Sequence, residues 1–135
     1  MELKKEMVKS ECAYRLLINL GFSASCAGFF YMAEAIKETS KPGEIHGSLS
    51  KKIYPKIAKK YGKTTASVEK ACRMSLKKAF REGDREAFMR LLGENYYILK
   101  NSPTICEFLS AVKIYLQFPV EVYESDSIEL LEKTG

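Results

Sequence analysis

Charged and polar side chains suited to base recognition recur along residues 65–82. Five residues recur at helical spacing in this segment: Lys70, Arg73, Met74, Lys77 and Arg81. On an α-helix, residues three and four apart lie on one face, so these side chains share one side of a helix. Arginine and lysine donate to guanine, and the major groove of B-DNA admits one helix. The spacing therefore predicts a recognition helix over about residues 65–82.

The opposite side of the same predicted helix is apolar. Six residues at helical spacing form it and are expected to face a protein core: Val68, Ala71, Cys72, Leu76, Ala79 and Phe80. A polar turn, Gly62-Lys63-Thr64-Thr65, precedes the helix, and either threonine hydroxyl is suited to cap it by accepting from a backbone N–H. Residues 53–61 before the turn carry a shorter helical pattern. The layout is typical of a helix–turn–helix.

Positive charge is concentrated around this predicted helix–turn–helix. Residues 51–81 contain eleven Lys or Arg and one acid, a local charge of +10 against +5 for the whole chain. Clustered cations bind duplex DNA favourably because they release condensed counterions. We expect phosphate contacts from six lysines and from two hydroxyl residues at the helix start, where backbone N–H groups meet phosphate: Lys51, Lys52, Lys56, Lys59, Lys63 and Lys77, with Thr65 and Ser67. The alternative interpretation is an ordinary solvated helical face.

The composition is that of a globular protein with one main core. The chain has 135 residues, of which 46% are hydrophobic and 29% are charged, the balance of a soluble domain. No apolar run approaches the ~20 residues of a membrane-spanning helix. The first eleven residues contain no apolar signal core. We therefore expect a cytoplasmic protein without a membrane partner.

No group of residues suited to catalysis or metal binding stands out. The four cysteines have wide, irregular spacings: Cys12, Cys26, Cys72 and Cys106. Three of the four lie in apolar helical patterns, where a free cysteine packs as a small apolar side chain. His46 is the one histidine, and it has no cysteine or carboxylate at metal-ligand spacing. We expect no disulfide framework, no metal, no cofactor and no enzymatic activity.

Apolar periodicity predicts an all-α fold of six helices. They span about residues 3–20, 25–39, 48–61, 65–82, 84–92 and 105–117. The second is expected to begin near Ser23 or Ser25. Pro55 lies inside the third, and because proline lacks an N–H it predicts either a kink or a fresh helix with Pro55 in its first turn.

Local sequence signals mark several of the helix ends. Gly21 follows the first helix as a residue suited to its C-terminal cap. Asp84 opens the fifth helix. Thr104-x-x-Glu107 has the spacing of a capping box, in which each side chain bonds the other residue's backbone N–H, and it opens the sixth helix.

The charge changes sign beyond Pro119. Residues 119–135 contain five acids and one lysine, a charge of −4, which leaves +9 for residues 1–118. We expect a helical body over residues 1–118 and an acidic C-terminal tail over 119–135. The tail is either an appendage that packs on the body or frays, or an acidic arm that competes with DNA for the basic face.

Several stretches of the chain together form a family pattern over roughly residues 16–117. They are Leu20-Gly21-Phe22, the segment 28–36 (GFFYMAEAI), the segment 53–61 (IYPKIAKKY) followed by Thr64, VEKA at 68–71 and Arg73, then Leu92-Gly93, and Pro103-Thr104 with Glu107-Phe108. In these stretches the chain resembles the C-terminal DNA-binding effector domain of the sporulation initiation regulators, the stage-zero sporulation protein A family of endospore-forming bacteria.

The resemblance implies an all-helical fold with an embedded helix–turn–helix and a transcription factor that binds promoter DNA. Glu69 and Arg73 match the family's base-reading pattern, whereas Lys70 replaces the usual arginine, and Ser67 and Met74 replace residues that are typically arginine and histidine. Lysine acts as a point charge where arginine grips guanine with two N–H groups. Met74 offers only apolar contact, for example to a thymine methyl. We expect a related but not identical target sequence.

The family's mode of assembly and control gives further expectations. Its members commonly bind as tandem dimers, so the expected partner is double-stranded DNA bound by a homodimer on tandem or paired sites. A receiver domain precedes the module in the family, and only about fifteen residues precede the match here, so we expect no control by phosphorylation within this chain. The alternative function is an interaction module that heterodimerises with a full-length relative and antagonises it. Five residues of the sixth helix either form its contact surface or simply fill the core: Phe108, Leu109, Val112, Tyr115 and Leu116.

Overall fold

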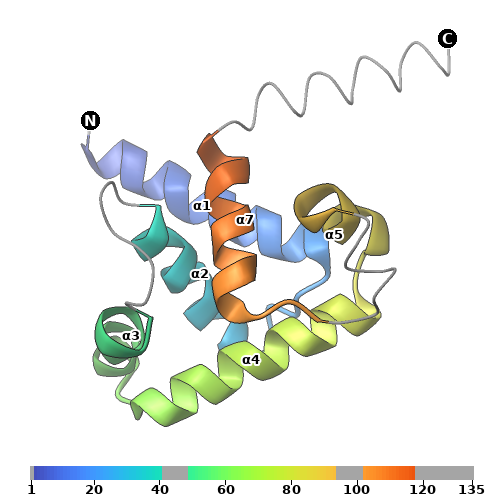
Figure 1. Cartoon of the computed structure of the whole chain (residues 1–135). Helices are drawn as coiled ribbons and strands as arrows, with labels where there is room; N and C mark the ends of the chain where they lie inside the picture. The colour runs from blue at the N-terminus through green and yellow to red at the C-terminus, as the bar shows by residue number, and fades with distance from the viewer. Residues whose placement is uncertain (1, 41–48, 94–101, 118–135) are drawn as a thin grey trace, which may run out of the picture.

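The computed structural model describes residues 2–40, 49–93 and 102–117 (Figure 1). Every element in those ranges is a helix, which confirms the predicted all-α fold. The elements are α1 (Glu2–Leu20), α2 (Ala27–Thr39), a π-helical turn (Leu49–Ile53), α3 (Tyr54–Tyr61), α4 (Thr65–Glu82), α5 (Arg85–Leu92) and α7 (Ile105–Gln117). His46 and the predicted tail over 119–135 lie outside the described residues.

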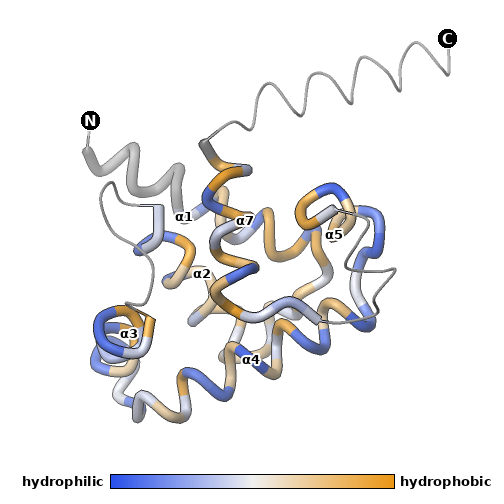
Figure 2. The backbone as a smooth tube through the Cα atoms, viewed as in Figure 1, coloured by the Kyte–Doolittle hydropathy of each residue, from blue (hydrophilic) through white to orange (hydrophobic). Residues whose placement is uncertain are grey.

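Helix α2 lies at the centre of the arrangement, and α4 runs along one side of it. α2 contacts α1, α3, α4 and α7, and α4 in turn contacts α3, α5 and α7 (Figure 1). Along α4, hydrophilic and hydrophobic segments alternate (Figure 2), as expected of a helix with one buried and one exposed face. The long basic helix is therefore supported by most of the described helices while one of its sides stays outside the packing.

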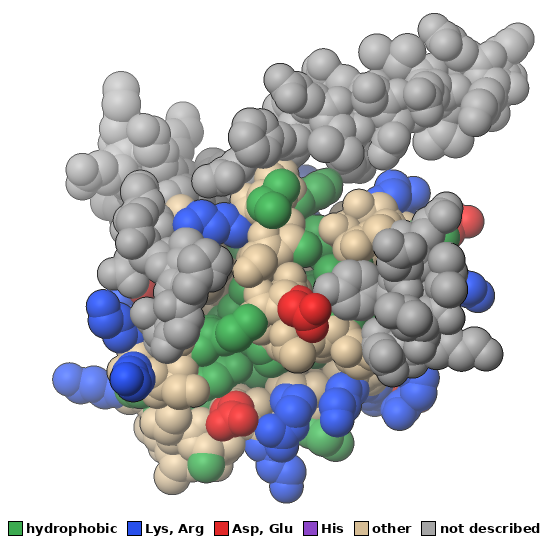
Figure 3. Space-filling view, in the orientation of Figure 1, with side chains coloured by type: hydrophobic (Ala, Val, Ile, Leu, Met, Phe, Trp, Pro, Cys, Tyr) green, Lys and Arg blue, Asp and Glu red, His purple; other side chains and the backbone are tan. Residues whose placement is uncertain are grey.

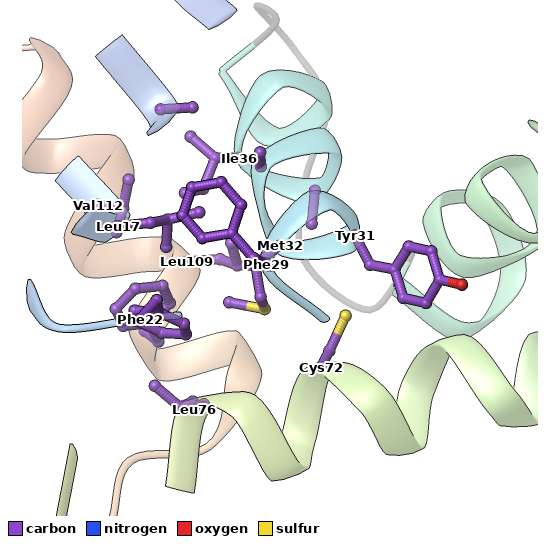
Figure 4. Close-up of a cluster of buried hydrophobic side chains, with 14 of the residues drawn as sticks. Leu17, Phe22, Phe29, Tyr31, Met32, Ile36, Cys72, Leu76, Leu109 and Val112 are labelled. Carbon is purple, nitrogen blue, oxygen red and sulfur yellow. The ribbon is translucent and has the colours of Figure 1, made fainter. Parts of the chain in front are cut away.

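The core joins the apolar faces of the helices. Figure 4 shows Cys72 and Leu76 directed from α4 toward Met32 of α2 and Phe22 of the α1–α2 connection. Phe22 lies 5.7 Å from Phe108 between ring centroids, and both are buried. Burying one large apolar side chain stabilises a fold by about 1.5–3 kcal/mol, so these contacts hold α4 firmly against α2 and α7.

Helix α2 approaches α4 closely at a glycine. A methyl group added to Gly28 would overlap Ser75 Oγ and lie 2.6 Å from the Ala71 carbonyl oxygen. Only glycine leaves room for two helix backbones to come this near. Sequence patterns assign no role to Gly28 beyond its place in the family pattern, because the contact joins residues more than forty positions apart.

Two of the predicted helix starts need correction or refinement. α2 begins at Ala27 rather than at Ser25, because Ser23 Oγ and Ser25 Oγ bond each other at 2.7 Å and Cys26 takes the N-cap position without a side-chain bond. The predicted third helix is divided into the π-helical turn and α3, and Pro55 lies in the first turn of α3. The fresh-helix alternative for Pro55 is therefore the correct one.

The predicted caps of the other helices are confirmed. Thr64 Oγ1 accepts from the Ser67 backbone N–H at 3.1 Å and begins α4. Asp84 Oδ1 caps α5 by accepting from Ala87 N–H at 3.0 Å. Thr104 and Glu107 exchange the two capping-box bonds before α7, at 3.1 and 2.9 Å.

Burial decides between the two interpretations of α7 for three of its residues and corrects the expectation for the cysteines. Phe108, Leu109 and Val112 are buried in the core, as the core-filling alternative predicts, whereas Tyr115 and Leu116 are partly buried. The exposed large apolar residue of α7 is Ile114. All four cysteines are free, but only Cys72 is buried, whereas the other three are exposed on the surface.

Candidate nucleic-acid interface

The sequence folds locally into two helices joined by a tight turn. α3 ends at Tyr61, and Gly62 caps it with a left-handed φ of 65°, while Lys63 N–H donates to the Ala58 carbonyl at 2.8 Å. These bonds satisfy carbonyls that the end of a helix leaves open. Thr64 then caps α4, so the chain changes direction sharply within three residues and α4 runs across the view in which α3 is seen nearly end-on (Figure 1). The turn fixes where the N-terminal end of α4 begins.

The core and the solvent divide α4 into two faces. Val68, Cys72, Leu76 and Ala79 are buried, while Ala71 and Phe80 are partly buried against the same core. The opposite side carries four exposed side chains in the middle of the helix: Lys70, Arg73, Met74 and Lys77. In Figure 3, Lys and Arg side chains gather along the lower edge of the view, where α4 runs in Figure 1.

Met74 is the apolar member of this exposed face. Its side chain is 56% exposed, although its type usually packs inside a protein. Exposure of this apolar side chain to water does not stabilise the fold. It is explained either by contact with a partner or by the fact that a protein surface tolerates a single apolar residue. An apolar residue beside Lys70 and Arg73 suits a groove in which thymine methyls lie beside hydrogen-bonding groups.

Glu69 and Arg73 form an ion pair on the same face. Arg73 Nη1 lies 3.3 Å from Glu69 Oε1, one turn earlier, and both side chains are about half exposed. Such a pair in solvent is weak, about 0.3–0.5 kcal/mol. The pair keeps the Arg73 guanidinium close to the helix. Because the pair is weak, little free energy is lost when the guanidinium turns to another acceptor.

Two lysines of α3 are paired with carboxylates of α2. Lys56 Nζ lies 2.9 Å from Glu38 Oε1, and Lys60 Nζ donates to Glu34 Oε1 at 2.6 Å. The bond to Glu34 raises the pKa of Lys60, so its ammonium is charged throughout the neutral range. Sequence reasoning missed both pairs, because residues 40–53 separate α2 from α3 and nothing local indicates that the two helices touch.

Buried titratable groups support the interface from beneath. Burial raises the pKa of the Cys72 thiol to about 12. Burial also raises the pKa of the Tyr54 phenol, which lies at the start of α3. Both groups are neutral at physiological pH, so neither adds charge beneath the basic outer face.

The structure places the twelve predicted site residues on the two helices, their turn and the preceding π-helical turn. Eleven are exposed, and Thr65 is half-buried at the start of α4. Lys51 and Lys52 lie in the π-helical turn, Lys56 and Lys59 on α3, and Lys63 in the turn between α3 and α4. Lys56 differs from the rest of these lysines in being held by a carboxylate of α2.

The described residues contain neither a metal-binding cluster nor a membrane-spanning helix. Among the described residues, no three His, Cys, Asp or Glu side chains come together in a way that would hold a metal ion. No described helix is long and apolar enough to cross a membrane.

A comparison with protein families gives a match over most of the chain. The family model described as "Sporulation initiation factor Spo0A C terminal" matches residues 13–116. The matched range begins within α1, ends within α7, and contains α3, the turn and all of α4.

Proposed function

The chain belongs to this sporulation initiation factor family, and on that premise we propose that it is a DNA-binding regulator of transcription that inserts α4 into the major groove. The observation that carries the proposal is the division of α4 between core and solvent. Val68, Cys72 and Leu76 anchor one side, and the other side offers donors, an acceptor and an apolar group at adjacent positions. A helix anchored in this way presents its outer face without loss of order on binding.

The exposed face supplies the proposed base contacts. Arg73 has the two-pronged donor geometry that suits guanine O6 and N7. Lys70 adds a second donor, Met74 contacts a thymine methyl, and Glu69 either accepts from cytosine N4 or orients Arg73 through their ion pair. These four residues lie within two turns of helix, so they reach a few consecutive base pairs.

The surrounding residues supply the proposed phosphate contacts. Exposed lysines flank the base-reading face on α4, on α3 and at the turn, and Thr65 and Ser67 lie at the N-terminal end of α4, where backbone N–H groups favour anions. The proposed phosphate-binding lysines are Lys51, Lys52, Lys59, Lys63 and Lys77. Lys56 reaches a phosphate only by leaving Glu38.

The test begins with selection of bound sequences from a random duplex pool, which also reveals half-site spacing and hence whether a homodimer binds. Arg73→Ala is then compared with wild type on the selected duplex and on a scrambled one. Loss of a base-reading arginine is expected to cost about 1–3 kcal/mol on the selected duplex and much less on the scrambled duplex.

Arg15→Ala is the matched control for this substitution. Arg15 pairs with Glu11 one turn earlier on α1, as Arg73 does with Glu69, at 2.7 Å. Its loss is expected to leave both affinities unchanged. Equal losses on both duplexes for Arg73→Ala would refute the base-reading role, and failure of the wild type to bind any duplex at low salt would favour the heterodimerising antagonist.

A further inference from the structure

The two ion pairs between α2 and α3 form a ladder. Glu34 and Glu38 are one turn apart on α2, and Lys60 and Lys56 are one turn apart on α3, so each helix presents two like charges on one side. The pairs join Glu34 to Lys60 at 2.6 Å and Glu38 to Lys56 at 2.9 Å. The sequence order is opposite on the two helices, which is the arrangement of antiparallel neighbours. Two rungs restrain both the distance and the rotation of α3.

The carboxylates of this ladder lie deeper than ordinary surface acids. The side chains of Glu34 and Glu38 are 14% and 18% exposed, whereas the paired lysines are more than half exposed. A carboxylate with little access to water is screened less, so it holds a cation more strongly than a fully exposed pair does. Glu34 also lies 3.9 Å from Lys37 of its own helix, so the acid is surrounded by cations.

We propose that Glu34 and Glu38 are positioning residues that hold α3 in place and withhold Lys56 and Lys60 from DNA phosphates, which limits sequence-independent binding. The inference rests on the proposed function. Phosphate contacts add affinity for every sequence alike. Withholding two cations therefore lowers affinity for scrambled DNA and leaves a larger share of binding to the base contacts of α4.

The short length of α3 explains why this helix needs restraint. α3 has only eight residues and a proline in its first turn, and a helix this short is marginal without tertiary contacts. Tyr61 of α3 packs edge-on against Tyr31 of α2 at 5.2 Å between ring centroids. The ladder and this ring contact fix α3 from one side. Because only the short turn from Gly62 to Thr64 joins the two helices, the position of α3 also fixes the start of α4.

The first experiment measures the ladder without DNA. Amide hydrogen exchange of α3 is compared among wild type, Glu34→Gln/Glu38→Gln, Lys56→Gln/Lys60→Gln and the variant with all four changes. Each double variant is expected to exchange about three- to tenfold faster in α3, as loss of two modest pairs implies. The fourfold variant is expected to show no further acceleration. Additive acceleration would overturn the ladder.

The second experiment measures binding to a scrambled duplex as a function of salt. Glu34→Gln/Glu38→Gln removes the carboxylate that holds each lysine in the ladder, so the plot of log K against log[salt] is expected to steepen by about 1 to 2 units. The ratio of selected to scrambled affinity is expected to fall. The matched control, Glu11→Gln/Glu86→Gln, removes the same charge from exposed acids of α1 and α5 and is expected to leave the slope unchanged.

The outcomes separate the two proposals. An unchanged slope in Glu34→Gln/Glu38→Gln, or the same steepening in the control, would overturn the withholding of the lysines. Non-additive exchange in a protein that binds no duplex would overturn the proposed function and the withholding with it, while leaving the positioning of α3 in place.

Discussion

Cys72 shows how one residue connects the inner side of α4 to the stability of the fold. It is fully buried, one position before the proposed guanine-reading Arg73. A thiolate would lose its hydration there, and the resulting penalty raises the pKa of the thiol from 9.0 to about 12. Folding thus favours the protonated form. Stability from this group is complete below pH 9 and is lost as the pH rises toward 12.

The pH dependence of unfolding checks this residue. In the unfolded chain the thiol ionises near pH 9, so the free energy of unfolding is expected to fall by about 1 kcal/mol between pH 8 and pH 10 on account of Cys72. Cys72→Ala removes that part of the decline, although it lowers stability at every pH because it leaves a small cavity. Urea titrations at pH 8, 9 and 10 measure both effects. An identical decline in the variant would contradict the assignment.

Helix α4 depends on a close crossing with α2 as much as on its own pattern. Gly28 lies over Ala71 and Ser75, the side of α4 that turns toward α2. The turn of α4 that approaches α2 at this crossing carries the proposed base-reading residues on its opposite side. Any widening of the crossing therefore moves Arg73 and Met74 outward as well as opening the core.

Gly28→Ala is expected to destabilise the protein by about 1–3 kcal/mol, because overpacking at a close helix contact forces the backbones apart. Ser75→Ala in the same chain removes the overlapping hydroxyl but not the Ala71 carbonyl, which would lie 2.6 Å from the new methyl. The double variant is therefore expected to recover only part of the loss. Thermal or urea unfolding of the two variants measures the difference. Full recovery would show that the carbonyl imposes no limit.

The elements are predicted well from sequence wherever the determining contacts are local. The span of α4 and its Thr64 cap follow from periodicity and from one hydroxyl near one N–H. The predicted start of α2 is wrong because Ser23 and Ser25 bond each other rather than capping the helix. The ladder and the Gly28 crossing cannot be predicted in this way, because both join residues that only the tertiary fold brings together.

The same distinction applies to the candidate interface. The exposed face of α4 follows from a single helical repeat, so the amino-acid sequence alone is enough to indicate its four base-reading candidates. The engagement of Lys56 by Glu38 depends on where α2 lies, and a charge count along the chain treats that lysine like its neighbours. Local pattern thus indicates which cations are present, and the fold indicates which of them another residue already holds.

At the scale of the whole molecule, charge is distributed unevenly. The chain carries +5 overall, whereas residues 51–81 carry +10. Of the remaining −5, −4 lies in residues 119–135, outside the described residues. A positive segment of this size attracts a polyanion, so we expect the basic side of α3 and α4 to lead the encounter with DNA.

The salt dependence of binding measures this polarity. Five proposed phosphate-binding lysines imply a slope of log K against log[salt] of about −4.5 per bound chain on a scrambled duplex. Lys52→Gln is expected to reduce the magnitude of the slope by about 0.9 and to weaken selected and scrambled duplexes by the same factor. Fluorescence anisotropy at four salt concentrations gives both values. A loss confined to the selected duplex would make Lys52 a base reader instead.

Gly21 and Gly83, each just after the end of a long helix, lie against one another. A methyl group on Gly21 would lie 2.5 Å from the Gly83 α-carbon, and Asp84 N–H donates to the Leu20 carbonyl at 2.9 Å. The C-terminal end of α4 thus packs against the C-terminal end of α1. If α4 binds DNA as proposed, we expect a genetic screen for loss of promoter occupancy to recover replacements at these two positions beside those at Arg73. A tilt of α4 would misalign every side chain on its exposed face.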